Sequence, residues 1–262
     1  MKVDRLAALL WAALVSAAGS AAAQPAPAQV CERQIFENSG YIVCSVTPGK
    51  DDLRLFWKGA DGQPFRTFSN LADALKKDGQ VLIFAMNAGM YRDDFTPIGL
   101  YIEHGAELRP ADTTEIKGPP GKVPNFYRKP NGVFLLGDNG AEILTTDEFL
   151  KRRPKAAFAT QSGPMLVIEG KLHPALIPGS TDRTRRSGVG VCGSGIVRFA
   201  ISDGDVNFHD FARLFRDELG CPNALFLDGG HGTGIYQMAL GMNDFSWHGG
   251  FGPIVGLVQS GE

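Results

Sequence analysis

The segment NFHDFARLFRDELGCPNALFLDGG, residues 207–230, contains the clearest helix and strand of this chain. Asn207 can cap the helix, and Asp210 lies in the first turn, where negative charge is favoured. Gly220 and Pro222 end the helix, and a short apolar strand over residues 224–227 runs into Asp228. The apolar stripe of the helix consists of Phe208, Phe211, Ala212 and Phe215. The segment predicts a strand–helix–strand unit near the C-terminus, with an acid at its end.

Short apolar or alternating segments separated by turn residues occupy most of the preceding chain. Residues 138–140 and 169–170 carry turn chemistry between paired strands. We expect Ser69 or Asn70 to cap a short helix that ends before Gly79. The expected strands cover residues 42–46, 53–57, 81–86, 98–103, 133–136, 141–144, 165–168 and 196–201, with the first two as a hairpin. This pattern predicts an α+β fold, a single mixed domain with a hairpin-rich, largely antiparallel sheet and few helices.

The composition of the 262 residues is that of an ordinary folded protein. Lys and Arg number 26 against 28 Asp and Glu, and 44% of residues are hydrophobic, which excludes disorder, collagen and coiled coil. A formal net charge of -2 lacks the positive excess of a nucleic-acid binder, so nucleic acid is not an expected partner. The 33 Gly and 16 Pro argue against a helical bundle, because both residues interrupt helices.

The N-terminal residues have the pattern of an export signal. Lys2 and Arg5 precede an apolar run over residues 6–18, and small residues up to Ala23 form a cleavage site. A membrane anchor is the alternative, but the run is shorter than a spanning helix requires and no second such run follows. We expect a signal peptide over residues 1–23, a linker over 24–30 and one domain over 31–262. The protein is then exported, periplasmic or secreted, with no membrane span after cleavage.

Four cysteines in an exported chain indicate two disulfides. Three pairings are open, and sequence order favours Cys31 with Cys44 and Cys192 with Cys221. Buried free thiols are the alternative. The chain has no C-x-x-C spacing, which argues against metal binding by cysteine.

Several familiar motifs fail on their context. Residues 188–193 fit G-x-G-x-x-G, but no apolar strand precedes them and no helix signal follows, so we do not expect a dinucleotide site. The five histidines are scattered without metal-ligand spacing, and no serine lies in a G-x-S-x-G elbow. We therefore expect no cofactor and no transition metal. Asp93 and Asp94 could contribute to a Ca²⁺ site, although two adjacent acids more often form a solvated turn.

Asp228 is the strongest candidate for chemistry that the residues alone provide. It ends an apolar strand, and the glycines after it allow the backbone to approach a ligand closely. The alternative is an Asp that caps its own loop. Arg183, Arg185 and Arg186 form a cationic cluster suited to phosphate, although such clusters are often simply solvated.

Seven segments in order resemble the phosphodiester glycosidase family. They are Asn87-Ala-Gly-Met-Tyr91, Gly99-Leu-Tyr101, Asn125-Phe-Tyr127, Asn131-Gly-Val-Phe134, Ser162-Gly-Pro-Met-Leu166, Arg186-Ser-Gly-Val-Gly190 and Asn223-Ala-Leu-Phe-Leu-Asp-Gly-Gly230. The resemblance runs from about residue 42 to 258 and is to the small exported bacterial members of this family, which are similar to the uncovering enzyme for mannose 6-phosphate tags. It implies an exported hydrolase that cleaves the bond between a sugar's anomeric carbon and a phosphodiester, acting on a small glycosyl phosphate or a polysaccharide.

The resemblance also suggests roles for residues in these segments. Asp228 would stabilise the oxocarbenium-like centre or activate water, and His231 would serve as an acid or base. Arg186 would hold the phosphate, since a guanidinium can take up charge as the phosphate leaves. The remaining expected substrate-binding residues are Asn87, Tyr91, Asn131, Ser162, Gly229 and Gly230.

Two other functions remain open from the sequence. One is a phosphodiesterase that breaks the P–O bond, a reaction that commonly uses two metal ions. The other is a carbohydrate-binding or envelope-assembly protein that keeps the fold without turnover. The oligomeric state is not predicted by any feature of the sequence.

Overall fold

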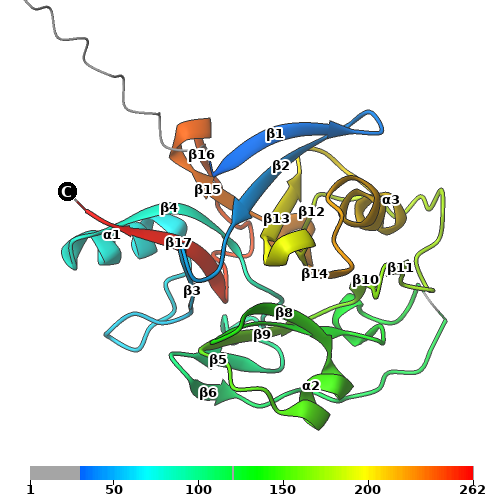
Figure 1. Ribbon diagram of the computed structural model, residues 1–262, viewed down its shortest axis with the longest axis horizontal. Coiled ribbons are helices and arrows are strands. Elements are labelled where there is room, and N and C mark those ends of the chain that lie inside the picture. Colours follow the sequence, from blue (N-terminus) through cyan, green and yellow to red (C-terminus); the bar gives the residue numbers. More distant parts are fainter. Residues whose placement is uncertain (1–29, 120, 262) are drawn as a thin grey trace, which may run out of the picture.

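The computed structural model describes residues 30–119 and 121–261 (Figure 1). The predicted signal peptide over residues 1–23, and the linker apart from residue 30, lie outside the described residues. Within the described part of the chain, no helix has both the length and the apolar character needed to cross a membrane.

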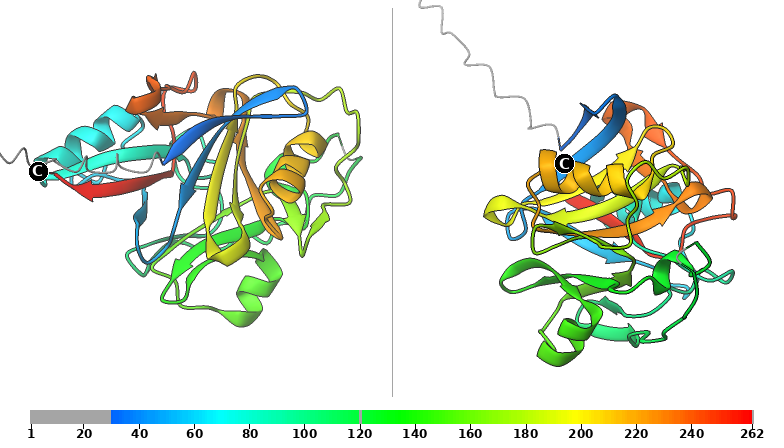
Figure 2. Two further views of the ribbon diagram at one scale, coloured as in Figure 1. Left: turned by 45° about the horizontal axis from the view of Figure 1, so that its top comes forward. Right: turned by 90° about the vertical axis from the view of Figure 1, so that its right-hand side faces the viewer.

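Residues 30–119 and 121–261 form three antiparallel sheets, and the largest has seven strands and carries the predicted strand–helix–strand unit. In this unit β13 (Val197–Ser202) and β14 (Asn223–Gly229) lie on either side of β12 (Arg186–Val191). They are parallel to each other because both pair antiparallel with β12. Helix α3 (Phe208–Arg213) and a π-helical turn (Leu214–Glu218) connect them along one face of the sheet (Figure 2). The strand order is β1 (Cys31–Phe36), β2 (Ser39–Val46), β13 (Val197–Ser202), β12 (Arg186–Val191), β14 (Asn223–Gly229), β10 (Met165–Ile168) and β11 (Lys171–Leu172).

The other two sheets of the described residues have five strands each. Helix α1 (Phe68–Lys77) covers one of them, whose order is β16 (Met242–Asn243), β15 (Ile235–Gln237), β4 (Gln80–Asn87), β17 (Ile254–Ser260) and β3 (Asp52–Phe56). The other sheet has the order β6 (Ala106–Arg109), β5 (Tyr101–Glu103), β9 (Phe158–Ser162), β7 (Gly132–Gly137) and β8 (Gly140–Thr145). Helix α2 (Thr146–Arg152) follows β8, and 3-10 turns lie at Asn125–Tyr127, Gly193–Gly195, Gly230–Gly232 and Met238–Leu240.

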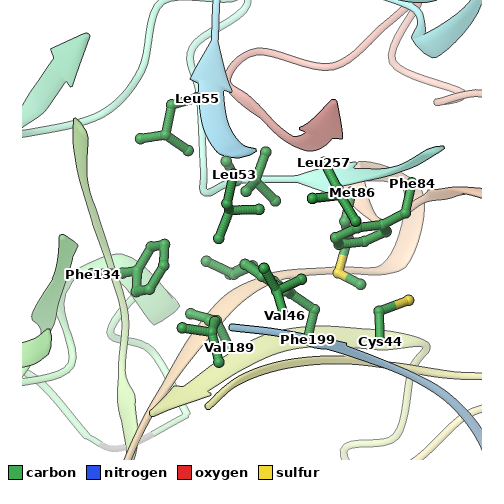
Figure 3. Packing of buried hydrophobic residues seen from close by; sticks show 14 of the residues in the cluster. Cys44, Val46, Leu53, Leu55, Phe84, Met86, Phe134, Val189, Phe199 and Leu257 are labelled. Atoms are coloured by element: carbon green, nitrogen blue, oxygen red, sulfur yellow. The ribbon is translucent and has the colours of Figure 1, made fainter. Parts of the chain in front are cut away.

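The main core lies where the three sheets face one another. Figure 3 shows Phe134 of one sheet, Phe84 of the second and Phe199 of the third directed into the same cluster. The Phe199 ring lies 5.4 Å from that of Phe84 and 5.9 Å from that of Phe134, between centroids. Burial of these aromatic and aliphatic side chains joins the sheets into one unit, because apolar surface removed from water stabilises the folded chain.

The α+β class and the predominance of antiparallel hairpins are confirmed. The predicted pairing of residues 42–46 with 53–57 is wrong, because β2 pairs with β1 and β13 whereas β3 pairs with β17 of another sheet. The helix predicted to start at Ser69 or Asn70 is capped instead by Thr67, whose Oγ1 accepts from the Asn70 amide at 3.1 Å. The first difference reflects long-range pairing, which local patterns do not specify. The second is a shift of two or three residues at a helix end, from Ser69 or Asn70 to Thr67.

Two glycines explain the false dinucleotide motif. A side chain at Gly188 would lie 3.0 Å from the Leu225 carbonyl oxygen and 3.1 Å from the ring of Phe211. One at Gly190 would lie 2.7 Å from Cys221 Sγ and 2.8 Å from the Phe215 ring. The Gly-x-Gly spacing in β12 therefore lets the helical segment pack closely against the sheet.

Both favoured disulfides are present. Cys31 joins Cys44 across the β1–β2 pair, and Cys192 joins Cys221, so that the end of β12 is tied to the segment before β14. Two disulfides are typical of proteins that fold in an oxidising compartment.

Candidate active site

A cavity of 490 Å³ opens at the end of β14, where the sequence predicted chemistry. This volume is within the range of small-molecule sites. Asp228 lies in its wall together with residues of the loop that follows β4. The lining consists of Met90, Tyr91, Arg92, Asp93, Phe95, Ile98, Asp228 and His248.

The backbone of Asp228 is held by a buried polar network that starts on two other strands. Ser187 of β12 lies opposite Asp228 in the sheet, and its Oγ donates to the Asp228 carbonyl oxygen at 3.2 Å. The same Oγ accepts from the Asp228 amide at 3.3 Å and from Asn87 Nδ2 at 2.9 Å. Asn87 Oδ1 also accepts from the Gly234 amide at 3.2 Å. The network fixes the position of Asp228 without using its carboxylate, which stays available for chemistry.

The carboxylate of Asp228 is in an environment that disfavours its charge. Oδ1 accepts from the Gly229 amide at 2.7 Å, which lowers the pKa, but desolvation by burial is the larger effect. Burial therefore raises the pKa of Asp228 from 3.8 to about 7, in spite of this hydrogen bond. A carboxyl group with a pKa near neutrality can exchange a proton or carry a charge at physiological pH, as acid–base catalysis requires.

Tyr91, one of the predicted substrate-binding residues, lines the same cavity as Asp228. Its hydroxyl donates to the Gly250 carbonyl oxygen at 2.7 Å and lies 3.2 Å from Ser246 Oγ. Burial raises the pKa of Tyr91, and the charge of Asp228 raises it further, so the two side chains share one electrostatic environment. The Tyr91 ring stacks on Phe95 with centroids 5.9 Å apart. The Tyr91 side chain is therefore fixed in position, and its ring can form one wall of a substrate site.

Arg186 does not reach this cavity, contrary to the expected phosphate contact. Its side chain is 1% exposed, and its guanidinium lies 3.6 Å from the centroid of the Phe208 ring. Nε donates to the Val206 carbonyl oxygen at 2.9 Å and Nη2 to that of Asp182 at 3.1 Å. Successive strand residues point to opposite faces, so the neighbouring serine of β12 faces Asp228 while Arg186 faces α3. We therefore assign Arg186 a structural role in place of the expected one.

Three other expected substrate contacts are buried inside the scaffold. Ser162 is fully buried, and its Oγ donates to the Leu227 carbonyl oxygen at 2.9 Å, one residue before the acid. Asn131 is 1% exposed, with Nδ2 donating to the Phe126 carbonyl oxygen at 2.9 Å and Oδ1 accepting from Thr146 Oγ1 at 2.9 Å. Asn87 is fully buried and engaged in the network described above. These polar side chains hold the loops around the cavity, and direct contact with a substrate is not part of their geometry.

His231 and the glycines after Asp228 form a loop beside the cavity. Gly230 has φ of 61°, a conformation that favours glycine, and its amide donates to the Arg185 carbonyl oxygen at 2.8 Å. The amide of Gly229 is occupied by the Asp228 carboxylate. The exposed imidazole of His231 lies edge-on to that of His248, with ring centroids 5.6 Å apart. Of the two, His248 is the one that lines the cavity of Asp228.

Arg92 and His248 are cavity residues that the sequence interpretation missed. Arg92 directly follows the Asn87–Tyr91 segment, so continuation of that motif by one residue would have found it. No comparable signal exists for His248, which lies 20 residues beyond Asp228 and belongs to no motif. Arg92 supplies the guanidinium that Arg186 does not.

Asp93 and Asp94, which the sequence left open as calcium ligands, lie in a turn. Asp94 Oδ1 accepts from the Thr96 amide at 3.0 Å, and hydrogen bonding with Thr96 lowers the pKa of Asp94. Asp93 is exposed at the cavity. Among residues 30–119 and 121–261, no three His, Cys, Asp or Glu side chains are grouped so that they could hold a metal ion.

Comparison with known proteins shows the family and the fold of this chain. The model of the phosphodiester glycosidase family matches residues 80–252, which include Asn87, Tyr91, Arg92, Asp228 and His248. The chain belongs to the phosphodiester glycosidase family. It is 33% identical over 185 residues to the uncharacterized protein YigE of Escherichia coli (strain K12), covering 71% of this chain and 70% of that protein.

Two solved structures share the fold of this phosphodiester glycosidase family member. The catalytic domain of zebrafish N-acetylglucosamine-1-phosphodiester alpha-N-acetylglucosaminidase, auto-inhibited by its pro-peptide, aligns with a TM-score of 0.59 and 15% identity. The alignment covers 87% of this chain and 81% of that domain. A hypothetical protein from Synechocystis aligns with a TM-score of 0.51 and 15% identity, covering 87% of this chain and 61% of that one. At this identity the likeness concerns the fold.

Proposed function

We propose that this protein is an exported hydrolase that cleaves glycosyl phosphodiesters between the anomeric carbon and the phosphate. The observation that carries the proposal is the cavity in which Asp228, with its raised pKa, is joined by Arg92 and Tyr91, in a chain of the phosphodiester glycosidase family. The zebrafish relative's name describes the same class of reaction. The two disulfides support export.

Asp228, Arg92 and Tyr91 each contribute to this reaction, and the chemistry of the substrate reduces what they must do. A phosphate monoester is a good leaving group, since its second ionisation lies near pH 6, so departure needs little help from a general acid. Ionised Asp228 stabilises the positive charge that develops at the anomeric carbon, or takes a proton from the attacking water. Arg92 balances the phosphate charge at the cavity rim, and Tyr91 bounds the sugar.

Hydrolysis in water enriched in heavy oxygen tests which bond breaks. The substrates are methyl phosphodiesters of α- and β-glucose 1-phosphate and of α- and β-N-acetylglucosamine 1-phosphate. Cleavage at the anomeric carbon places the label in the sugar, whereas cleavage at phosphorus places it in the phosphate. Label in the phosphate would show that the protein is a phosphodiesterase that breaks the P–O bond.

A further inference from the structure

A second cavity lies beside the loop that follows Asp228. Its volume is 610 Å³, and residues on both sides of that loop line it. His231 belongs to this cavity and His248 to the cavity of Asp228, and the two rings are in edge contact. The residue before His248, Trp247, also lines the second cavity. The two cavities therefore adjoin across a pair of histidines.

Two aromatic side chains stand exposed in the lining of this second cavity. Trp247 is 73% exposed and Phe245 is 60% exposed, and their ring centroids are 4.8 Å apart. Large apolar side chains that are exposed together commonly mark a binding surface. Because neither ring is buried in the fold, their position two residues apart in one loop is not explained by core packing.

Polar groups line the same cavity as the two rings. Arg185 Nη1 and Asp244 Oδ2 form an ion pair at 2.8 Å in the lining. Thr233 also lines the cavity, is 4% exposed, and its Oγ1 has no hydrogen-bond partner among the described residues. A buried hydroxyl without a partner carries a desolvation cost that a ligand hydroxyl would remove.

We propose that this second cavity is a saccharide-binding site, in which Trp247 and Phe245 hold a sugar ring of a longer chain whose reacting unit lies in the Asp228 cavity. One face of a pyranose ring presents C–H groups that complement the negative face of an aromatic ring, while its edge carries hydroxyls that need hydrogen-bond partners. Aromatic faces beside Thr233, Arg185 and Asp244 meet both needs. The choice of a sugar as occupant rests on the proposed function, and the inference adds that the substrate is a saccharide chain.

Glycan binding by variants of Trp247 tests this site. Binding of the protein without its signal peptide is measured on an array of bacterial surface polysaccharides and their oligosaccharides. Trp247→Ala is expected to weaken the recognised binding about tenfold or more, and Trp247→Phe to retain most of it, because a ring remains. Since Trp247 is mostly exposed, its replacement leaves the fold intact, which thermal unfolding verifies. Ile35→Ala removes an apolar side chain that is 81% exposed on β1 and is expected to change nothing.

Three results would overturn the site. The first is binding to no glycan on the array, and the second is glycan binding that Trp247→Ala leaves unchanged. The third is a concentration-dependent dimer that Trp247→Ala abolishes in the absence of glycan binding, which would make the exposed rings a protein interface.

Hydrolysis of the methyl phosphodiesters is measured in parallel, because these substrates carry only a methyl group beyond the phosphate and no second sugar. If none is hydrolysed but glycan binding depends on Trp247, the proposed function fails and the saccharide site stands. If they are hydrolysed while Trp247→Ala leaves glycan binding unchanged, the site fails and the proposed function stands.

Discussion

The carboxylate of Asp228 packs directly against the α-carbon of Gly232. A methyl group at position 232 would overlap Oδ2 and lie 2.8 Å from Cγ of Asp228. The backbone of the 3-10 turn Gly230–Gly232 thus forms the surface on which the proposed catalytic acid rests. This contact explains the desolvation of the carboxylate, since chain atoms occupy positions where water would otherwise lie.

Replacement of Gly232 by Ala tests this contact. The added methyl group must displace the carboxylate, so kcat/KM on a methyl phosphodiester is expected to fall about tenfold or more. In the Asp228→Ala background the same change meets no carboxylate, and its further effect is expected to be small. A double-mutant cycle of kcat/KM measures the coupling. Losses that simply add would show that position 232 acts independently of Asp228.

Asp228→Asn is expected to lower kcat/KM about a hundredfold or more while ligand binding persists, because it removes the charge and keeps the shape. Asp93→Asn is the matched control, since Asp93 lines the same cavity with an exposed carboxylate. Turnover and equilibrium binding are measured for both variants. Equal losses in the two would indicate a general electrostatic effect, and full turnover in Asp228→Asn would remove the acid from the mechanism.

The pH dependence of kcat/KM reports the ionisation of Asp228 in the free enzyme. If the ionised form acts, kcat/KM rises with pH and levels off above the pKa of about 7. Asp228→Asn is expected to lack this rise. A wild-type profile that instead falls through neutral pH would mean that the protonated form acts, as a general acid.

Folding stability provides a measure of the same pKa that does not need a substrate. The folded pKa of about 7 exceeds the unfolded value of 3.8, so between these values the folded state holds a proton that the unfolded state has lost. Stability therefore falls as pH rises from about 4 to 7. The Asn variant does not titrate, and relative to wild type it is expected to gain up to about 4 kcal/mol across this window. Urea unfolding at pH 4 and pH 8 measures the gain, and a constant difference would contradict the raised pKa.

Replacement of Arg92 is expected to affect catalysis, and replacement of Arg186 is expected to affect folding stability. Arg92→Ala removes an exposed cation from the cavity, so it should raise KM or lower kcat about tenfold with little change in stability. Arg186→Met removes a buried guanidinium from Phe208 and from two carbonyl groups, and should destabilise the fold by about 2–4 kcal/mol. Kinetics and urea unfolding of both variants separate the two roles. A stable Arg186→Met with impaired phosphate binding would restore the sequence-based assignment.

Local patterns specified much of the secondary structure in this chain. The helix that begins after Asn207, the strand that ends at Asp228 and the turns at residues 138–140 and 169–170 all follow from spacing, capping and turn chemistry. These features depend on near neighbours in the sequence, so a window of a few residues contains the necessary information. The predicted pairing of residues 42–46 with 53–57 was wrong, because the partner of a strand depends on contacts between residues far apart in the sequence.

Strand and turn patterns indicated the α+β class, the order of four cysteines after an export signal indicated the two disulfides, and the apolar strand before Asp228 indicated the candidate acid. The direction of each buried polar side chain was decided only in three dimensions. Arg186 and Ser187 are adjacent in sequence, yet one packs on a helix and the other holds Asp228, because strand residues alternate between faces and the sequence does not label the faces. Arg92 and His248 meet Asp228 in one cavity because three distant segments converge there, a consequence of sheet packing that no local pattern encodes.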